Sequence, residues 1–166
     1  MSAVDRFSTA ASNAGATVHA VDRSEAAETI AELACQPAIG TPLSFDGVSL
    51  PEMIETDPNK AELQVAESGI TSAPLGVQSL GSVLIPSDER MGGPFSLFPE
   101  RHIAVVESDD LVRDVETAFT RIADRYRTDG NDAVLVTGPS TTGDMGALVT
   151  GVHGPGELHI VVIDDE

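Results

Sequence analysis

Two apolar, β-branched runs near the C-terminus constrain the fold more than any other feature, and they span residues 133–136 and 158–163. The first run leads into a loop of glycine, proline and hydroxyl residues at 137–144, and the second follows a similar loop at 151–156. Near-continuous runs of this kind predict buried parallel strands. Because binding and catalytic residues concentrate on loops held by rigid strands, we expect a functional site where the two loops meet.

Segments with strand and helix character alternate along the rest of the chain. We predict further strands at 17–21, 70–75, 77–85 and 101–106, and helices at 4–14, 24–35, 60–67 and 111–129. This alternation predicts an α/β fold, in which a single domain over residues 1–166 holds a mixed, largely parallel sheet flanked by helices.

Turn and cap residues add local predictions. These are helix N-caps at Ser24 and 108–110, helix stops at Ser68–Gly69 and at Gly130, a bulge at Gly81, a hairpin loop at 87–94 and a short helix within 145–150.

The charge balance excludes several kinds of partner. The chain has 27 acidic residues against nine lysines and arginines, which gives a net charge of −18, and Lys60 is its only lysine. Such a surface repels phosphate backbones and anionic lipids, so we predict no nucleic acid and no membrane partner. The balance indicates a protein of a high-salt cytoplasm, such as that of a halophilic archaeon, where salt screens the self-repulsion. The alternative is an ordinary acidic mesophilic protein.

Cys35 is the only cysteine. A lone cysteine forms no internal disulfide and cannot by itself hold an iron–sulfur cluster, and we expect Cys35 to be a buried packing residue. The sequence shows no apolar stretch of membrane-spanning length and no signal-peptide pattern. We therefore expect a cytoplasmic protein.

The first C-terminal loop has the glycine spacing of a phosphate-binding P-loop without its chemistry. Gly138 and Gly143 match the two glycines, yet Asp144 stands where the motif needs lysine, and its carboxylate would repel a nucleotide phosphate. The G-x-G-x-x-G fingerprint of dinucleotide-binding proteins is missing as well. Ser140, Thr142 and Asp144 remain as groups that either cap a short helix or surround a bound anion.

His153 lies between glycines in the second loop, where a turn would expose its imidazole. If Asp144 lies close, its carboxylate could orient the ring as a catalytic acid or base. The alternative is a histidine that only bonds a loop carbonyl. His102, at the head of an apolar strand, is similarly ambiguous. These three residues lack metal-ligand spacing, so we predict no metal site, and we predict no cofactor.

The two loops together resemble the LUD-domain family of the lactate utilisation protein C type. The matching residues are Gly138, Pro139, Ser140, Thr142 and Asp144, then Gly151, His153, Gly154 and Pro155, with weaker matches at 69–71, 81–82 and 99–106. The resemblance implies a fold like the NagB/RpiA/CoA-transferase group. It also implies a role beside separate iron–sulfur subunits that oxidise L-lactate to pyruvate. By position it implies catalytic Asp144 and His153, and ligand-binding Gly138, Ser140, Thr142, Gly154 and His102.

Three positions depart from the family pattern. The family often has arginine at the position of Thr141, glutamate near Gly146, and an acid at the position of Ser79. If that acid is a nucleophile, this chain cannot form an acyl-glutamate intermediate there.

Three functions therefore stay open. The first is an accessory or ligand-binding component of an L-lactate oxidation system, which binds a small organic anion or iron–sulfur partner subunits. The second is a stand-alone isomerase or acyl-transfer enzyme that uses Asp144 and His153. The third is a non-catalytic structural module that associates with itself as a homo-oligomer.

Overall fold

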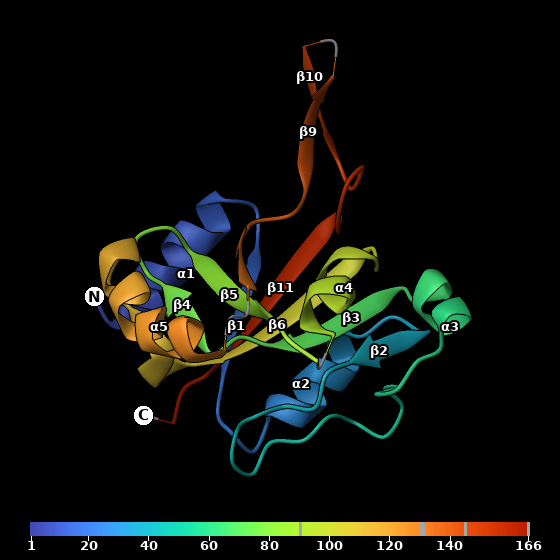
Figure 1. Ribbon diagram of the computed structural model, residues 1–166, viewed down its shortest axis with the longest axis horizontal. Coiled ribbons are helices and arrows are strands. Elements are labelled where there is room, and N and C mark those ends of the chain that lie inside the picture. The colour runs from blue at the N-terminus through green and yellow to red at the C-terminus, as the bar shows by residue number, and fades with distance from the viewer. Residues whose placement is uncertain (90, 130–131, 145, 166) are drawn as a thin grey trace.

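The computed structural model describes residues 1–89, 91–129, 132–144 and 146–165. A sheet of five parallel strands forms its centre (Figure 1). In spatial order the strands are β1 (Thr17–Val21), β11 (Glu157–Ile163), β6 (Arg101–Glu107), β3 (Ser68–Ser72) and β2 (Ala38–Gly40). Because β1 pairs with β11, strands from the two ends of the chain lie side by side.

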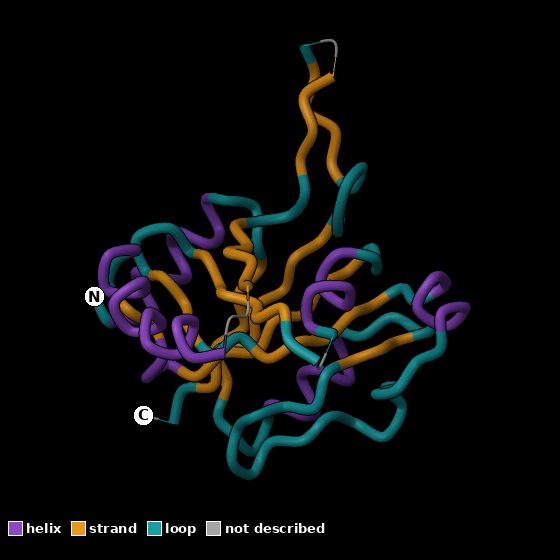
Figure 2. Tube along the Cα trace, in the orientation of Figure 1, coloured by secondary structure: helices purple, strands orange, loops and turns teal. Residues whose placement is uncertain are grey.

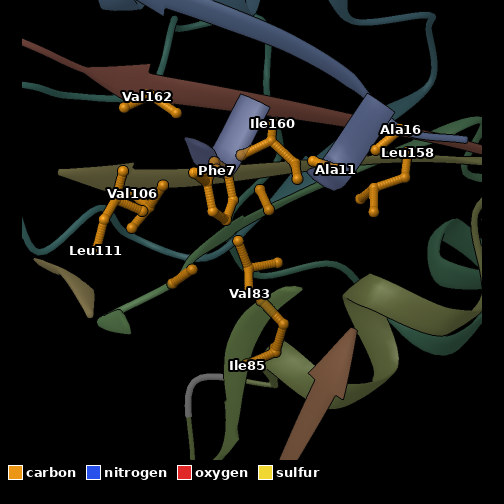
Figure 3. Close-up of a cluster of buried hydrophobic side chains, with 12 residues drawn as sticks. Phe7, Ala11, Ala16, Val83, Ile85, Val106, Leu111, Leu158, Ile160 and Val162 are labelled. Carbon is orange, nitrogen blue, oxygen red and sulfur yellow. The ribbon is translucent and has the colours of Figure 1, made fainter. Parts of the chain in front are cut away.

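Apolar clusters lie on both faces of this sheet. On one face, helix α1 (Ala3–Asn13) packs Phe7 and Ala11 against strand residues such as Ile160 (Figure 3). On the other face, helix α2 (Ala26–Leu33) packs Ile30 against residues such as Ile103. The inner strands β6 and β11 are largely buried on both sides, which explains why their sequences are almost continuously apolar.

Two short helices lie beside β2 and β3. They are α3 (Lys60–Val65) and α4 (Gly92–Leu97). Helix α4 approaches β3 so closely that a Cβ on Gly69 would lie 1.9 Å from the carbonyl oxygen of Phe95. Glycine is therefore required at this contact.

A second, four-stranded sheet packs beside the first. Its spatial order is β7 (Leu111–Val112), β4 (Leu75–Val77), β5 (Ser82–Ser87) and β8 (Asp132–Thr137). A 3-10 turn, η1 (Ser108–Asp110), precedes β7, and the long helix α5 (Val115–Asp129) follows it. Helix α5 packs Ala118 against Val77 and Leu84 of this sheet.

A hairpin of β9 (Thr141–Asp144) and β10 (Ala147–Thr150) projects away from both sheets (Figures 1 and 2). All four residues of β10 are exposed. The hairpin therefore forms an arm of the molecule and contributes little to its core.

The predicted α/β class, with a largely parallel sheet flanked by helices, is confirmed. The strands predicted at 17–21 and 101–106 match β1 and β6, and the terminal run matches β11. Two predicted central strands, 70–75 and 77–85, are divided differently. Their residues form β3, β4 and β5.

The prediction of a buried parallel strand at 133–136 was wrong. Strand β8 pairs antiparallel with β5, and Val134 and Leu135 are 36% and 40% exposed. An apolar run shows that a strand suits burial, but it does not show which strand will lie beside it.

The short helix expected within 145–150 was also wrong over the described residues, which form β10 of the hairpin. Gly146, with φ of +84°, lies beside the turn, and β-branched Val149 and Thr150 favour the strand.

Several local predictions need correction as well. Helix α2 begins after Glu25 without a side-chain cap from Ser24, and Asp114 rather than residues 108–110 caps α5. Ser68 and Gly69 begin β3 instead of ending a helix, and Gly81 lies in the β4–β5 turn rather than at a bulge. Residues 92–94 begin α4 instead of belonging to a hairpin loop. Cys35 is exposed, although it was expected to be a buried packing residue. The predicted helix stop at Gly130 lies outside the described residues.

Candidate functional site

The two C-terminal loops meet, as the sequence predicts. The N–H of Ser140 donates to the carbonyl of Pro155 at 2.8 Å, and the N–H of Gly151 donates to the carbonyl of Ser140 at 2.9 Å. A Cβ on Gly154 would lie 3.4 Å from the Ser140 hydroxyl. Ser140 and Gly154 therefore lie side by side. Because residues 151–156 precede β11, this contact lies at the amino edge of the parallel sheet.

The carboxylate that lies in this contact is one that the sequence analysis missed. A Cβ on Gly156 would lie 2.1 Å from Glu100 Oε1, and a Cβ on Gly151 would lie 3.3 Å from the same atom. The glycines therefore let the Glu100 side chain rest against the turn that carries exposed His153. The sequence alone did not show that Glu100 lies beside the second loop, because this follows from the register of β11 with β6. In that register the N–H of Glu157 donates to the Glu100 carbonyl at the start of the sheet.

Asp144 and Thr142 belong to the projecting hairpin. Thr141 pairs with Thr150 at its base, while the backbone of Asp144 pairs with Ala147 toward its tip. Four extended residues from Ser140 to Asp144 span about 13 Å. The side chain of Asp144 lies outside the described residues, so its catalytic pairing with His153 stays a prediction.

Gly138 has a clear role in packing. Its φ is +66°, and a Cβ there would lie 2.1 Å from the carbonyl oxygen of Ala14, at the end of α1. Only glycine combines this backbone conformation with so close an approach. Gly138 therefore fixes the loop after β8 on α1, and its predicted ligand-binding role stays a prediction.

His102 lies under the surface, with 1% of its area exposed. Its Nε2 lies 2.7 Å from the Thr71 hydroxyl, and among the described residues its buried Nδ1 has no hydrogen-bond partner. Burial lowers the pKa of His102 to about 3, so the ring is neutral at physiological pH. His102 thus supports the β3–β6 pair from within. Its proposed contact with a ligand stays a prediction.

An acidic hollow of about 330 Å³ lies at the carboxyl edge of the parallel sheet. Its lining includes the hydroxyls of Thr41 and Ser72 and the carboxylates of Asp88, Glu107 and Asp110. Arg23 pairs with Glu107 at 2.8 Å and Arg121 pairs with Asp110. Burial raises the pKa of Asp110, while Arg121 opposes that rise. The carboxyl edge is where ligands usually bind in open α/β sheets, but this lining disfavours an anion.

A second hollow of about 330 Å³ has the opposite charge. It lies between α1 and the β4–β5 turn, and its lining includes Arg6, Arg113, Gln78, Ser79 and Asn13 without any acidic side chain.

Arg6 is held in place by a residue distant in the sequence, whereas Arg113 is exposed and pairs with its chain neighbour. The Nε of Arg6 donates to Gln78 Oε1 at 2.9 Å, and the Gln78 amide donates to the Leu111 carbonyl at 2.7 Å. The Nε of Arg113 donates to Asp114 at 2.9 Å. Guanidinium groups suit a carboxylate or a phosphate. We define this as the arginine hollow.

Among the described residues, no three His, Cys, Asp or Glu side chains lie close enough to hold a metal ion. The described helices also include none with the length and apolar character that a bilayer crossing requires.

Comparison with known proteins identifies the family. A model described as the LUD domain matches residues 51–163. Lactate utilization protein C of Bacillus subtilis is 31% identical over 138 residues, which are 78% of this chain and 53% of that protein. Its counterpart in Deinococcus radiodurans is 30% identical over 105 residues, which are 62% of this chain and 49% of that protein.

The chain spans about half the length of the curated relatives it matches. These relatives come from bacteria, so the comparisons do not support an archaeal source. A solved structure of a DUF162-family protein from Deinococcus radiodurans matches the fold with a TM-score of 0.74 and 24% identity, over 97% of this chain and 96% of the other. Because the LUD-domain model covers more than half of the sequence, this protein belongs to the LUD-domain family.

Proposed function

We propose that this chain is an accessory, anion-binding component of a lactate-utilisation system. The relatives named lactate utilization protein C support the biological setting. The arginine hollow carries the proposal for the ligand, because it gathers two of the few cations of a chain with net charge −18. A small organic carboxylate such as lactate matches that charge, and its hydroxyl can bond to Gln78 or Ser79.

Ser79 supports binding at this hollow rather than acyl transfer. It occupies the position at which the family resemblance expects an acid, and it lies in the hollow with Arg6 and Arg113. A carboxylate at this position would repel an anionic ligand, whereas a serine hydroxyl can donate a hydrogen bond to it. The same replacement removes a nucleophile. The chain therefore has a hydroxyl rather than a carboxylate beside the two arginines.

Electron transfer would then take place on other chains. Cys35 is the only cysteine, and one thiolate cannot hold an iron–sulfur cluster. We include separate iron–sulfur subunits in the proposal, with the projecting hairpin as their contact. Leu148, Val149 and Val152 on or beside it are 80%, 43% and 52% exposed, and exposed apolar groups of this kind suit a protein partner.

A thermal-shift screen in molar salt tests the ligand. Lactate, pyruvate, sugar phosphates and CoA esters are each added to the chain and to the Arg6→Gln and Arg113→Gln variants. Lactate or pyruvate at one hundred times its dissociation constant should add about 2.7 kcal/mol of apparent stability. Each variant should lose most of this gain, because a guanidinium has been removed from the hollow.

Arg127→Gln provides the control, since this exposed arginine lies on α5 outside the hollow. It should respond like the unchanged chain. A shift that survives both hollow variants would reject the arginine hollow, and the absence of any shift would reject the ligand class.

A further inference from the structure

Strand β8 (Asp132–Thr137) lies at the edge of the four-stranded sheet. It pairs with β5 on one side, and on its other side no strand is present among the described residues. An edge strand presents unpaired N–H and C=O groups that can pair with another chain. Among its six residues only Asp132 is charged, and proline is absent. The strand therefore lacks the charges and prolines that usually protect such an edge.

The composition of β8 does not match its exposure. Residues 133–136 form the kind of continuous apolar run that is found in strands covered on both faces. Yet Val134 and Leu135, which point to opposite faces, are 36% and 40% exposed. Next to Leu135, an apolar hollow of about 410 Å³ lies between β8 and α5, and Phe119 on its rim is 65% exposed. An open strand edge and partly exposed apolar side chains on both faces therefore lie at one place.

The register with β5 indicates which groups of β8 point outward. Ala133 lies opposite Pro86, which has no N–H to donate, so this is best read as a pair that exchanges no hydrogen bonds. Four residues on, Thr137 lies opposite Ser82 with their hydroxyl oxygens 2.6 Å apart, as expected for the closer, non-bonded type of pair. Since the two types alternate, the N–H and C=O groups of Ala133, Leu135 and Thr137 face the open edge.

We propose that β8 pairs antiparallel with β8 of a second copy, about a twofold axis at Leu135. This axis lies perpendicular to the sheet, so a given side chain lies on the same face of the joined sheet in both copies. Leu135 meets Leu135 of the partner, and Ala133 meets Thr137. Residues 133, 135 and 137, whose backbone N–H and C=O groups face the open edge, therefore pair only with the same three residues of the second copy. The two four-stranded sheets join into one eight-stranded sheet. The same patch is used twice, as a twofold interface requires.

Charge favours a second copy in this register. Two chains of net charge −18 repel each other over most of their surfaces. The paired residues 133–137 are uncharged. The two Asp132 carboxylates lie at opposite ends of the ladder, about 20 Å apart along the strands. That separation exceeds the screening length of about 8 Å at physiological ionic strength, so β8 is a contact at which two acidic copies meet without opposing charges.

Sedimentation equilibrium of the full chain in molar salt tests the proposal. The unchanged chain should be a dimer at micromolar concentration. Leu135→Glu should raise the dimer dissociation constant roughly tenfold or more, because the two-fold axis sets two carboxylates against each other. Leu148→Glu makes the same change on the exposed hairpin and should leave the dimer intact. Near-ultraviolet circular dichroism shows that each variant is folded.

Cysteine substitutions test the register in a Cys35→Ser background. Leu135→Cys should form an intermolecular disulfide, because residues opposite each other in a bonded pair lie about 5.5 Å apart between Cα atoms. Val134→Cys should not, because its own copy would lie about 8 Å away and on a diagonal. A monomeric chain, or a dimer lost with Leu148→Glu and kept with Leu135→Glu, would overturn the proposal.

Discussion

His102 shows how a residue can look like a site residue in the sequence and be a core residue in the structure. It begins an apolar strand, as a ligand-binding residue at a sheet edge would, but α4 and neighbouring strands enclose it completely. Among the described residues its ring makes one hydrogen bond, with Thr71, and this bond joins β3 to β6. Sequence reasoning could place the residue on β6, but the face and depth of its ring depend on α4, whose first residues fall in the loop predicted at 87–94.

Burial of His102 makes the stability of the protein sensitive to acid. Its folded pKa of about 3 lies below the usual 6.5, so the unfolded chain binds a proton first as the pH falls. Stability from the neutral ring is present above pH 6.5 and is lost toward pH 3, by roughly 1.4 kcal/mol per pH unit. We expect His102→Gln to lose less stability than the unchanged chain between pH 7 and pH 5, as measured by urea unfolding.

The exposed His153 offers a matched control. His153→Gln should follow the unchanged chain at both pH values. Equal pH dependence in His102→Gln and the unchanged chain would show that the buried ring is not the source.

The strands β8 and β11 show what sequence patterns can and cannot predict about secondary structure. Both runs were predicted as buried parallel strands, and only β11 is one, with neighbours on both sides. The meeting of the two loops was predicted correctly at Ser140 and Gly154. The arginine hollow was not predicted, since Arg6 and Arg113 come from distant parts of the chain and only the packing of α1 beside the β4–β5 turn brings them together. Apolar runs in the sequence therefore indicate where a strand lies, but the partners of that strand and the residues that meet in a site depend on contacts between distant parts of the chain.

The hairpin of β9 and β10 should matter for partners and not for folding. A Leu148→Ser, Val149→Ser double variant removes exposed apolar groups, so we expect unchanged thermal stability to within about 2 °C. If the proposed function holds, co-expression with cysteine-rich subunits of a lactate-utilisation system should recover less of the visible iron–sulfur absorbance with this variant than with the unchanged chain.

Leu97→Ser is the control for that experiment, because Leu97 on α4 is 46% exposed and lies outside the hairpin. If both proteins recover the subunits equally well, the hairpin is not the contact.

The acidic surface is a property of the whole molecule, and it opposes folding at low salt. With 27 acidic residues against nine basic ones, compaction brings like charges together across the surface. The described ion pairs, such as those of Arg23 with Glu107 and Asp165, offset only a few of them. Burial and strand pairing therefore have to stabilise the fold against a net repulsion that depends on salt.

Dilution from molar salt to about 0.1 M, where the screening length grows to about 10 Å, should lower the urea midpoint of unfolding. The change should be continuous with salt and should appear equally with sodium and potassium chloride, because screening depends on ionic strength. A midpoint that stays constant across this range would contradict the high-salt interpretation.

The pairing of β1 with β11 has a consequence for how the protein is made. Residues 157–163, the neighbour of residues 17–21 in the sheet, are synthesised more than a hundred residues after them. Until then the edge of β1 that pairs with β11 has no partner strand, and α1 can cover only some of the apolar side chains of β1. The central sheet is therefore completed only once residues 157–163 have been made, and this pairing of residues far apart in the sequence gives the fold a high contact order.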